Sequence, residues 1–140
     1  MILFDSSVVI DPRDSDSPFH DWAKRQIAEA VQEGGEGGAV NTIVVSEASV
    51  RAENRDAVPT LLEGLGLKLV PLPISAAIPA AKAFAIYLDR LKKEGKKPEN
   101  RVPLPDFLIG AHAKAESMKL VTRDPDRVKT YFPEVQLVIP

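Results

Sequence analysis

Short apolar segments rich in β-favouring residues alternate with segments of helical periodicity along the chain, and this alternation constrains the fold more than any other feature. A helix between two strands returns the chain to the end of the sheet where the first strand began, so successive strands run parallel. Parallel sheets are covered by helices on both faces. The alternation therefore predicts an α/β fold built around a central parallel sheet.

Residues that favour helix starts and ends delimit the expected elements. Ser17, Asn41 and Ser75 are placed to act as N-caps, and Gly34 and Gly95 are placed to end helices. The expected helices span residues 18–33, 42–53, 56–64, 75–94 and 105–117, with a short helix from residue 125. The expected strands span residues 1–4, 39–40, 67–72, 120–122 and 136–139. Residues 8–10 also favour β-structure, so residues 5–7 form a polar break in an apolar start.

The composition excludes several classes of protein. With 140 residues, of which 44% are hydrophobic and 27% charged, the chain is expected to form one globular domain, residues 1–140. It has no cysteine, which excludes disulfides, thiolate nucleophiles and cysteine metal sites. Its two histidines, His20 and His112, disfavour a histidine-ligated metal site.

The start of the chain has no basic stretch before its apolar residues and no small-residue cleavage site, so we expect no signal peptide. No apolar segment approaches the roughly 18 residues that cross a bilayer. The chain is therefore expected to be cytoplasmic, with no membrane partner. Its net charge of −2 would not by itself attract nucleic acid.

Four acidic residues occur where solvent-facing charges are not expected. Asp5 follows the first expected strand directly, and Glu47 lies in the apolar segment IVVSEASV. Asp106 lies in the first turn of the helical segment LPDFLIGAHA, and Asp124 follows the strand LVT. Ligand sites in open α/β sheets form at the carboxyl ends of the strands. We therefore expect Asp5 and Asp124 to lie close together, with Asp106 directed at the same place.

Each of these acids also has a separate structural explanation. Asp106 could complement the dipole of its helix, Asp124 could be a turn or N-cap residue, and Glu47 could extend its carboxylate to solvent. Asp5 has no evident turn or cap role, and a lone buried carboxylate is costly unless it is paired or binds a metal. One acidic pocket accounts for all four residues at once.

Four carboxylates without histidine or cysteine form a hard-oxygen site of the kind that binds Mg²⁺ or Mn²⁺. A divalent cation removes the mutual repulsion of crowded carboxylates, and it would explain why Asp5 is tolerated next to a core strand. Such an ion also polarises a phosphodiester and activates a water molecule for in-line attack. No covalent nucleophile is then required.

Basic residues flank two of the acids. They are Lys92, Lys93, Lys96, Lys97 and Arg101 before Asp106, and Arg123, Arg127 and Lys129 around Asp124. By themselves they would be solvated basic helix ends. Beside an acidic metal site they favour a rim that guides the phosphates of a nucleic acid.

Other candidate catalytic residues are better explained structurally. His112 lies six residues after Asp106, off the helical face of that residue, which favours a structural role. Ser6 and Ser7 have no plausible His/Asp relay, so a serine hydrolase is excluded. Asp126 is a possible additional acid, but its position on a surface helix is the better explanation.

The sequence blocks around the four acids resemble those of the PIN-domain family. The blocks are DSSVVID, NTIVVSEAS, LPDFLIGAHAKA and LVTRDPDRVKTYFP, and they span essentially the whole chain in the family's order. The similarity is greatest to VapC-type toxins of bacterial and archaeal toxin–antitoxin pairs. It implies a three-layer α/β/α fold and an endoribonuclease that depends on Mg²⁺ or Mn²⁺.

The resemblance also implies site residues and partners. It assigns catalytic and metal-binding roles to Asp5, Glu47, Asp106 and Asp124. The family often has Asn two positions after the first of these acids, where this chain has Ser7, and a hydroxyl can still bond a carboxylate or water. The implied partners are an RNA substrate and an antitoxin that blocks the site.

We expect the antitoxin to bind a hydrophobic groove between the helices 18–33 and 75–94, which carry Trp22 and Phe84. An arginine of the antitoxin would compete with the metal for the carboxylates through charge-assisted hydrogen bonds. We also expect a homodimer that forms through an apolar surface near the C-terminal part of the chain.

Two other functions stay open at this point. A catalytically silent module of the same fold could bind RNA or a partner protein and keep its acids for ion-dependent folding. A phosphoryl-transfer domain would use Asp5 as its nucleophile, but no phosphatase-like pattern of Lys or Ser/Thr follows. Cleavage of RNA that depends on a divalent cation separates the nuclease from the silent module, and trapping of phosphorylated Asp5 would support the phosphoryl-transfer domain.

Overall fold

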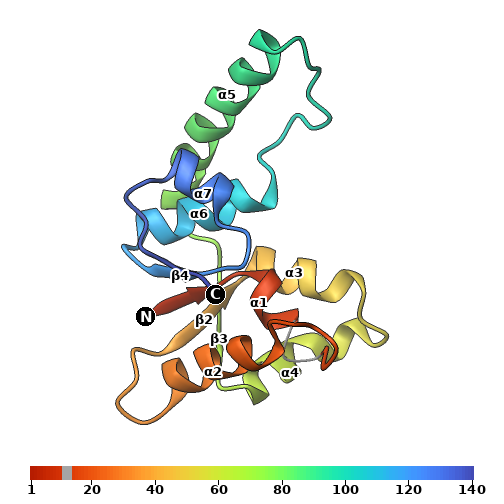
Figure 1. The fold of residues 1–140 in the computed structure, drawn as a ribbon, viewed down its shortest axis with the longest axis vertical. Coiled ribbons are helices and arrows are strands. Elements are labelled where there is room, and N and C mark those ends of the chain that lie inside the picture. Colours follow the sequence, from red (N-terminus) through yellow and green to blue (C-terminus); the bar gives the residue numbers. More distant parts are fainter. Residues whose placement is uncertain (11–13) are drawn as a thin grey trace.

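The computed structural model describes residues 1–10 and 14–140, and within them a parallel sheet of five strands forms the centre of the fold (Figure 1). The strands are β1 (Ile2–Phe4), β2 (Gly38–Asn41), β3 (Lys68–Val70), β4 (Lys119–Val121) and β5 (Leu137–Val138). They lie in the order β3-β2-β1-β4-β5, and every neighbouring pair is parallel. The predicted α/β fold with a central parallel sheet is confirmed.

β1 lies in the middle of the sheet, between β2 and β4. Leu3 is in register with Ala39 of β2 and with Leu120 of β4, and both Leu3 and Phe4 are fully buried. The chain extends the sheet through β2 and β3 on one side of β1 and then returns to form β4 and β5 on the other side. The strand order therefore reverses at the carboxyl ends of β1 and β4, which is where open α/β sheets form ligand sites.

Helices cover both faces of the sheet, as the resemblance to a three-layer α/β/α fold implied. Figure 1 shows α2 (His20–Val31) and α4 (Val58–Gly64) on one side, and α5 (Ala77–Lys93), α6 (Pro105–Ala115) and α7 (Asp126–Tyr131) on the other. The helices α1 (Ser6–Ile10) and α3 (Thr42–Val50) follow the carboxyl ends of β1 and β2. Short 3₁₀ helices, η2 (Arg55–Ala57) and η3 (Ile74–Ala76), precede α4 and α5. Within residues 1–10 and 14–140, every helix is too short or too polar to cross a lipid bilayer.

The segment after β1 is helical, although residues 8–10 favour β-structure. The main-chain carbonyl of Asp5 accepts hydrogen bonds from the N–H groups of Val8 and Val9, at 3.1 and 3.3 Å, and so begins α1. Both valines are fully buried in the hydrophobic core. Packing of the valines outweighs their intrinsic preference, which is a weak determinant. The expectation of β-structure here was wrong, and Asp5 begins a helix that the sequence analysis did not anticipate.

The expected helix starts differ in part from the structure. Asn41 caps α3 by accepting a hydrogen bond from the N–H of Val44 at 3.0 Å, as predicted. The Ser17 hydroxyl accepts a hydrogen bond from the N–H of Phe19 at 3.2 Å, but α2 begins after these residues. Ser75 lies inside η3 and does not cap the long helix α5.

The two helices that were expected to form an apolar groove lie on opposite sides of the sheet (Figure 1). Trp22 of α2 is half-buried against the core. Phe84 of α5 is 5% exposed and contacts Phe107 of α6, with 5.4 Å between the ring centroids. These aromatic side chains therefore cover separate faces of the sheet, and the expected groove between residues 18–33 and 75–94 does not form.

Gly110 allows α6 to lie close to Phe132, the residue that follows α7. A Cβ atom at position 110 would lie 2.6 Å from a carbon of the Phe132 ring, and Phe132 is only 2% exposed. The absence of a side chain at this position therefore sets the spacing between α6 and the end of α7, two elements that carry residues of the candidate site.

Candidate active site

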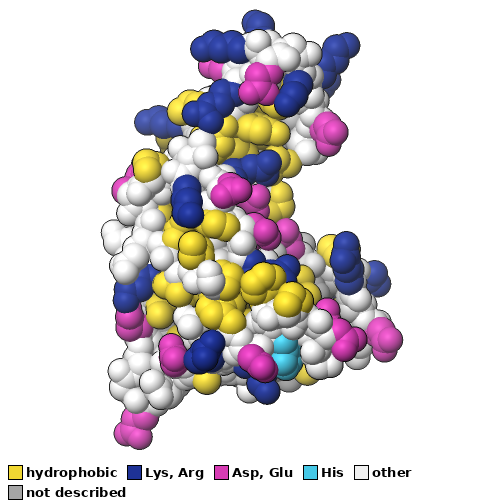
Figure 2. Space-filling model, viewed as in Figure 1, with side chains coloured by type: hydrophobic (Ala, Val, Ile, Leu, Met, Phe, Trp, Pro, Cys, Tyr) yellow, Lys and Arg dark blue, Asp and Glu magenta, His cyan; other side chains and the backbone are white. Residues whose placement is uncertain are grey.

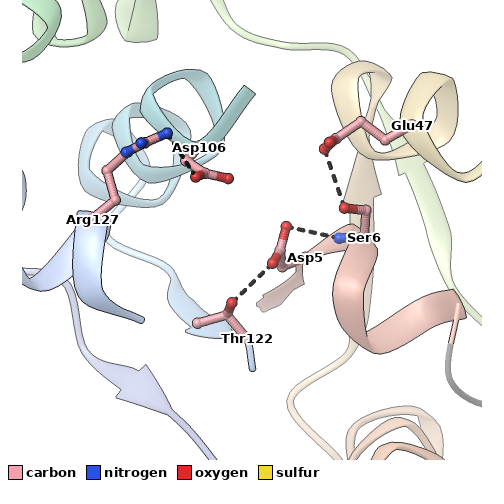
Figure 3. Close-up of polar contacts among 6 residues, drawn as sticks. All are labelled: Asp5, Ser6, Glu47, Asp106, Thr122 and Arg127. Atoms are coloured by element: carbon pink, nitrogen blue, oxygen red, sulfur yellow. Dashed lines mark hydrogen bonds and ion pairs between the residues drawn. The ribbon is translucent and has the colours of Figure 1, made fainter. Parts of the chain in front are cut away.

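Asp5 follows β1 directly and is surrounded by hydrogen-bond donors (Figure 3). Its Oδ1 accepts a hydrogen bond from the N–H of Ser6, and its Oδ2 accepts from the hydroxyls of Ser7 and Thr122, each at 2.8 Å. Asp5 is 8% exposed, and these donors compensate for the water that the carboxylate has lost. The protein's own donors therefore stabilise the buried carboxylate, and binding of a metal ion to Asp5 stays a prediction.

Hydroxyl groups join the ends of β1 and β4. Thr122 Oγ1 donates to Asp5 and also accepts a hydrogen bond from the N–H of Asp124 at 3.0 Å. Ser7 Oγ donates to Asp5 and accepts from the N–H of Arg123 at 3.2 Å. The expectation that Ser7 can bond a carboxylate is confirmed, and these contacts fix Asp124 close to Asp5.

Glu47 projects from α3 toward Asp5 (Figure 3). Its Oε1 accepts a hydrogen bond from the Ser6 hydroxyl at 3.2 Å. Burial raises the pKa of Glu47 above its ordinary value, and the negative charges of Asp5 and Asp106 raise it further, while the Ser6 hydroxyl acts in the opposite direction. The Glu47 carboxylate therefore lies close enough to both aspartates to interact with their charges.

Asp106 approaches the same region from α6 (Figure 3). Its Oδ2 accepts a charge-assisted hydrogen bond from Nη1 of Arg127 at 3.2 Å. Burial raises the pKa of Asp106, and so do the charges of Asp5 and Asp124, whereas the Arg127 guanidinium lowers it. The pKa of Asp106 is raised overall, because the ion pair with Arg127 does not fully offset burial and the repulsion from the other acids.

The charges of the four predicted acids therefore act on one another near the point where the strand order reverses, and we call Asp5, Glu47, Asp106 and Asp124 the acidic cluster. Asp106 and Asp124 line a cavity of about 450 Å³, the acidic cavity, whose walls also include Tyr87, Arg90, Arg127 and Tyr131. Glu47 lines a second depression of about 830 Å³, the α3–α4 groove, together with Ser6, Ile10, Val50, Arg51 and Leu61. Figure 3 shows Asp5 between Asp106, which lines the acidic cavity, and Glu47, which lines the α3–α4 groove.

The chemistry of this cluster fits a hard divalent cation, since all of its donors are carboxylate oxygens. In the described residues, however, no group of three acidic or histidine side chains is arranged to hold an ion. Asp106 is turned toward Arg127, and Glu47 is turned toward Ser6. An ion shared by these acids would therefore require at least one of them to change its rotamer.

His112 lies apart from the acids and has a structural role, in agreement with its interpretation from the sequence. It is 3% exposed, and its Nδ1 lies 3.1 Å from Nδ2 of Asn41, the N-cap of α3. Because the amide nitrogen is a donor, Nδ1 accepts and the proton of the neutral ring is placed on Nε2. Burial lowers the pKa of His112, which favours this neutral form.

The predicted basic residues divide into two groups. Arg123 and Arg127 line the acidic cavity, and Lys96 and Lys97 line an adjacent cavity of about 460 Å³ that Arg127 also borders. The others occupy exposed positions: Lys92, Lys93, Arg101 and Lys129. Figure 2 shows basic side chains around the projecting end of α5 and acidic side chains in the hollow below it. This distribution agrees with a basic rim beside an acidic centre.

Several partners of the acids were not predicted from the sequence. They are Ser6, whose hydroxyl donates to Glu47, Thr122, whose hydroxyl donates to Asp5, and Arg127, which pairs with Asp106. Thr122 precedes Asp124 at the end of a strand, and a hydroxyl at that position is the signal that could have identified it. Arg127 was assigned to the rim alone because nothing in its local sequence indicates a carboxylate partner.

The fold and the cluster together define an α/β domain with an acidic site at the carboxyl ends of its central strands. The sequence matches the model of the PIN domain family over residues 2–133. The chain therefore belongs to the PIN domain family. No protein with a curated description matches its sequence.

Several solved structures share this fold at low sequence identity. FitAcB from Neisseria gonorrhoeae is 21% identical, with a TM-score of 0.65, and the match covers 98% of this chain and 96% of that one. VapBC2 from Rickettsia felis, bound to a DNA fragment from its promoter, is 16% identical, with a TM-score of 0.63 and coverage of 99% and 98%. A toxin–antitoxin complex from Klebsiella pneumoniae is 19% identical, with a TM-score of 0.58 and coverage of 99% and 96%. These likenesses support the fold.

Proposed function

We propose that this protein is a metal-dependent endoribonuclease that hydrolyses RNA phosphodiester bonds in the cytoplasm and acts as the toxin of a toxin–antitoxin pair. The observation that carries the proposal is that, in a PIN domain, Asp106 interacts electrostatically with Asp5, Glu47 and Asp124 at the carboxyl ends of the central strands. Such a cluster has the donor chemistry for Mg²⁺ or Mn²⁺.

The side chains have distinct parts in this proposal. Asp5, oriented by Ser7 and Thr122, would be the most rigid metal ligand. Asp106 and Asp124 would complete the site from the acidic cavity, and Glu47 would do so from the α3–α4 groove. A bound divalent cation would polarise the scissile phosphate and activate a water molecule. The arginines at the acidic cavity would bind neighbouring phosphates of the RNA.

The antitoxin part of the proposal draws on the fold neighbours, one of which belongs to a toxin–antitoxin complex from Klebsiella pneumoniae. The α3–α4 groove begins at Glu47 and exposes large apolar side chains, with Ile10 39%, Leu61 53% and Val50 63% accessible. An apolar antitoxin segment in this groove could direct an arginine toward the carboxylates. This groove takes the place of the one expected between α2 and α5.

A homodimer is part of the same proposal. The sequence led us to expect its contact near the C-terminal part of the chain. We propose instead exposed apolar residues in η3 and α5, since Ile74 is 91%, Ile78 63% and Ile86 53% accessible. Exposed large apolar side chains that gather in a patch are typical of protein interfaces. In a two-fold dimer the same patch would be used by both copies.

The experiment that tests the nuclease is cleavage mapping on total cellular RNA by the purified protein, with Mg²⁺ or Mn²⁺ and with a chelator. We expect cleavage only with the divalent cation, and none by Asp5→Asn or Asp106→Asn. Asp106→Asn should melt no lower than the wild type, because burial and neighbouring acids disfavour its charged form. Asp126→Asn is the matched control, since Asp126 lines the acidic cavity but is an exposed residue of α7.

Other outcomes would identify the competing functions. Full activity in Asp5→Asn or Asp106→Asn would refute the site assignment. Binding of RNA without cleavage under every divalent ion would identify a catalytically silent module. Covalent phosphorylation of Asp5 would identify a phosphoryl-transfer domain, although the burial of Asp5 and its hydrogen bonds at both oxygens disfavour it as a nucleophile.

A further inference from the structure

Arg127 holds an unusual position between the acidic cluster and an aromatic cluster. Its Nη1 lies 3.2 Å from Oδ2 of Asp106. Its Cζ lies 5.3 Å from the ring centroid of Tyr87 and 5.4 Å from that of Phe107. The planar guanidinium is therefore held by ring faces while one of its edges reaches the carboxylate, a combination that lysine could not reproduce.

The same arginine borders two cavities. It lines the acidic cavity with Asp106 and Asp124, and it lines the adjacent cavity with Lys96 and Lys97. Its side chain is 34% exposed, and that of Asp106 is 42% exposed. The guanidinium can therefore leave Asp106 and still remain at the boundary of the two cavities, where a backbone phosphate would meet it.

A divalent cation and this guanidinium are competing partners for Asp106. Both are positive, both bind carboxylate oxygens, and each repels the other at the separations that one carboxylate imposes. In the described part of the chain no three acids are arranged to hold an ion, and Asp106 has one carboxylate oxygen, Oδ2, paired with a cation of the protein itself. Binding of an ion to Asp106 thus breaks or weakens the contact with Arg127.

Resting on the proposed function, we infer that Arg127 is the internal competitor of the divalent ion at Asp106, and that ion binding releases its guanidinium to an RNA phosphate. Arg127 is then a positioning residue with two successive partners. It offsets part of the negative charge at Asp106 when no ion is bound, and it becomes available to RNA only when the ion has arrived. RNA therefore binds the ion-loaded protein more tightly than the ion-free protein.

The first test measures ion binding by calorimetry with Mn²⁺ alone, without RNA. Arg127→Met removes the charge and keeps a long side chain that packs well against aromatic rings. We expect it to bind Mn²⁺ about three- to tenfold more tightly than the wild type, in line with loss of a partly exposed ion pair. Arg90→Met is the matched control, because Arg90 lies over Tyr131 in the same cavity at 5.1 Å from the ring centroid. It should change the Mn²⁺ affinity by less than about twofold.

The second test measures binding of a short single-stranded RNA by fluorescence anisotropy, with Ca²⁺ or with a chelator. With Ca²⁺, Arg127→Met should bind RNA more weakly than the wild type, and the slope of log affinity against log salt should fall by about 0.7 in magnitude, as for one lost phosphate contact. With the chelator, Arg127→Met and the wild type should differ less in RNA affinity than they do with Ca²⁺, because Asp106 still holds the wild-type guanidinium; a difference as large as with Ca²⁺ would contradict the release of Arg127 by the ion.

The outcomes separate this inference from the proposed function. If the wild type binds Mn²⁺ and cleaves RNA but Arg127→Met leaves the Mn²⁺ affinity unchanged or weakens it, the inference is overturned and the nuclease stands. If the wild type binds no Mn²⁺, both are overturned. Circular dichroism checks the fold of each variant. Should Arg127→Met fail to fold, Arg127→Gln replaces it in both tests, because it is also uncharged and can still form a hydrogen bond with Asp106. We expect it to change the Mn²⁺ and RNA affinities in the same directions.

Discussion

At the scale of single residues, the candidate site depends on small hydroxyl side chains as much as on its acids. Ser7 and Thr122 both donate to Oδ2 of Asp5, and each accepts a main-chain N–H from the segment after β4. These hydroxyls therefore orient the carboxylate and join two strand ends at once. A buried carboxylate without such donors would be costly.

Thr122→Val keeps the shape of the side chain and removes the hydroxyl. We expect it to weaken Mn²⁺ affinity or RNA cleavage by roughly 10- to 100-fold, because residues that orient metal ligands have effects of this size. Calorimetry and cleavage assays measure the two quantities. Thr130→Val is the control, since its hydroxyl donates to the Asp126 carbonyl on the exposed helix α7. Equal losses in the two variants would contradict the role given to Thr122.

His112 gives the fold a pH dependence that is separate from the acids. Burial lowers its pKa in the folded state, so the unfolded chain binds a proton more readily. The stability that the neutral ring provides is fully present above the ordinary value of 6.5, and it is lost as the pH falls through the lower folded value. We expect the melting temperature of the wild type to exceed that of His112→Gln by less at about pH 5.5 than at about pH 7.5. The melts are run with a chelator, and a difference that stays constant or grows on acidification would contradict the prediction.

At the scale of elements, α6 connects the site to the core. Its first turn carries Asp106, and its interior residues Phe107, Gly110 and His112 are buried. Phe107 packs against Phe84 of α5, and Gly110 packs against Phe132. The position of Asp106 is therefore fixed by contacts made further along the same helix.

Gly110→Ala tests this close packing. The added methyl group would lie 2.6 Å from the Phe132 ring, which is buried and has little room to move. We expect a loss of about 1–3 kcal/mol in the free energy of unfolding, as is typical of overpacked cores. Urea unfolding measures this loss. Gly64→Ala in α4 is the control, because nothing lies within 4 Å of an added Cβ there, and a loss as large in this variant would show that the Gly110 effect is not steric.

At the scale of the whole molecule, the α3–α4 groove and the acidic cavity meet at the carboxylate cluster from two directions. Glu47 lines one and Asp106 lines the other, with Asp5 between them (Figure 3). In the proposed function, RNA would bind at the acidic cavity and an antitoxin in the α3–α4 groove, and both would reach the same carboxylates. Inhibition would then be separable from substrate binding by mutation.

Leu61→Glu places a charge in the apolar part of the α3–α4 groove, on a different helix from Glu47. We expect it to abolish co-purification with the product of the adjacent upstream gene while leaving divalent-dependent RNA cleavage intact, because Leu61 is not one of the proposed metal ligands. Pull-down and cleavage assays measure both properties. Val102→Glu is the control, since Val102 is also exposed, at 69% against 53% for Leu61, but lies in the loop before α6. Loss of the complex in Val102→Glu but not in Leu61→Glu would contradict the antitoxin site in the α3–α4 groove.

The sequence by itself determined the parallel α/β sheet, the Asn41 cap and the positions of Asp5 and Asp124 after strands and of Asp106 in the first turn of a helix. These features follow from local periodicity and from the fact that the carboxyl ends of parallel strands lie at the same end of the sheet. Only the tertiary structure decided that Val8 and Val9 continue as a helix and that α2 and α5 lie on opposite sides of the sheet. It also decided that Thr122 supports Asp5 and that Arg127 pairs with Asp106. Such contacts join residues distant in sequence, so they depend on how the elements pack, which no local pattern encodes.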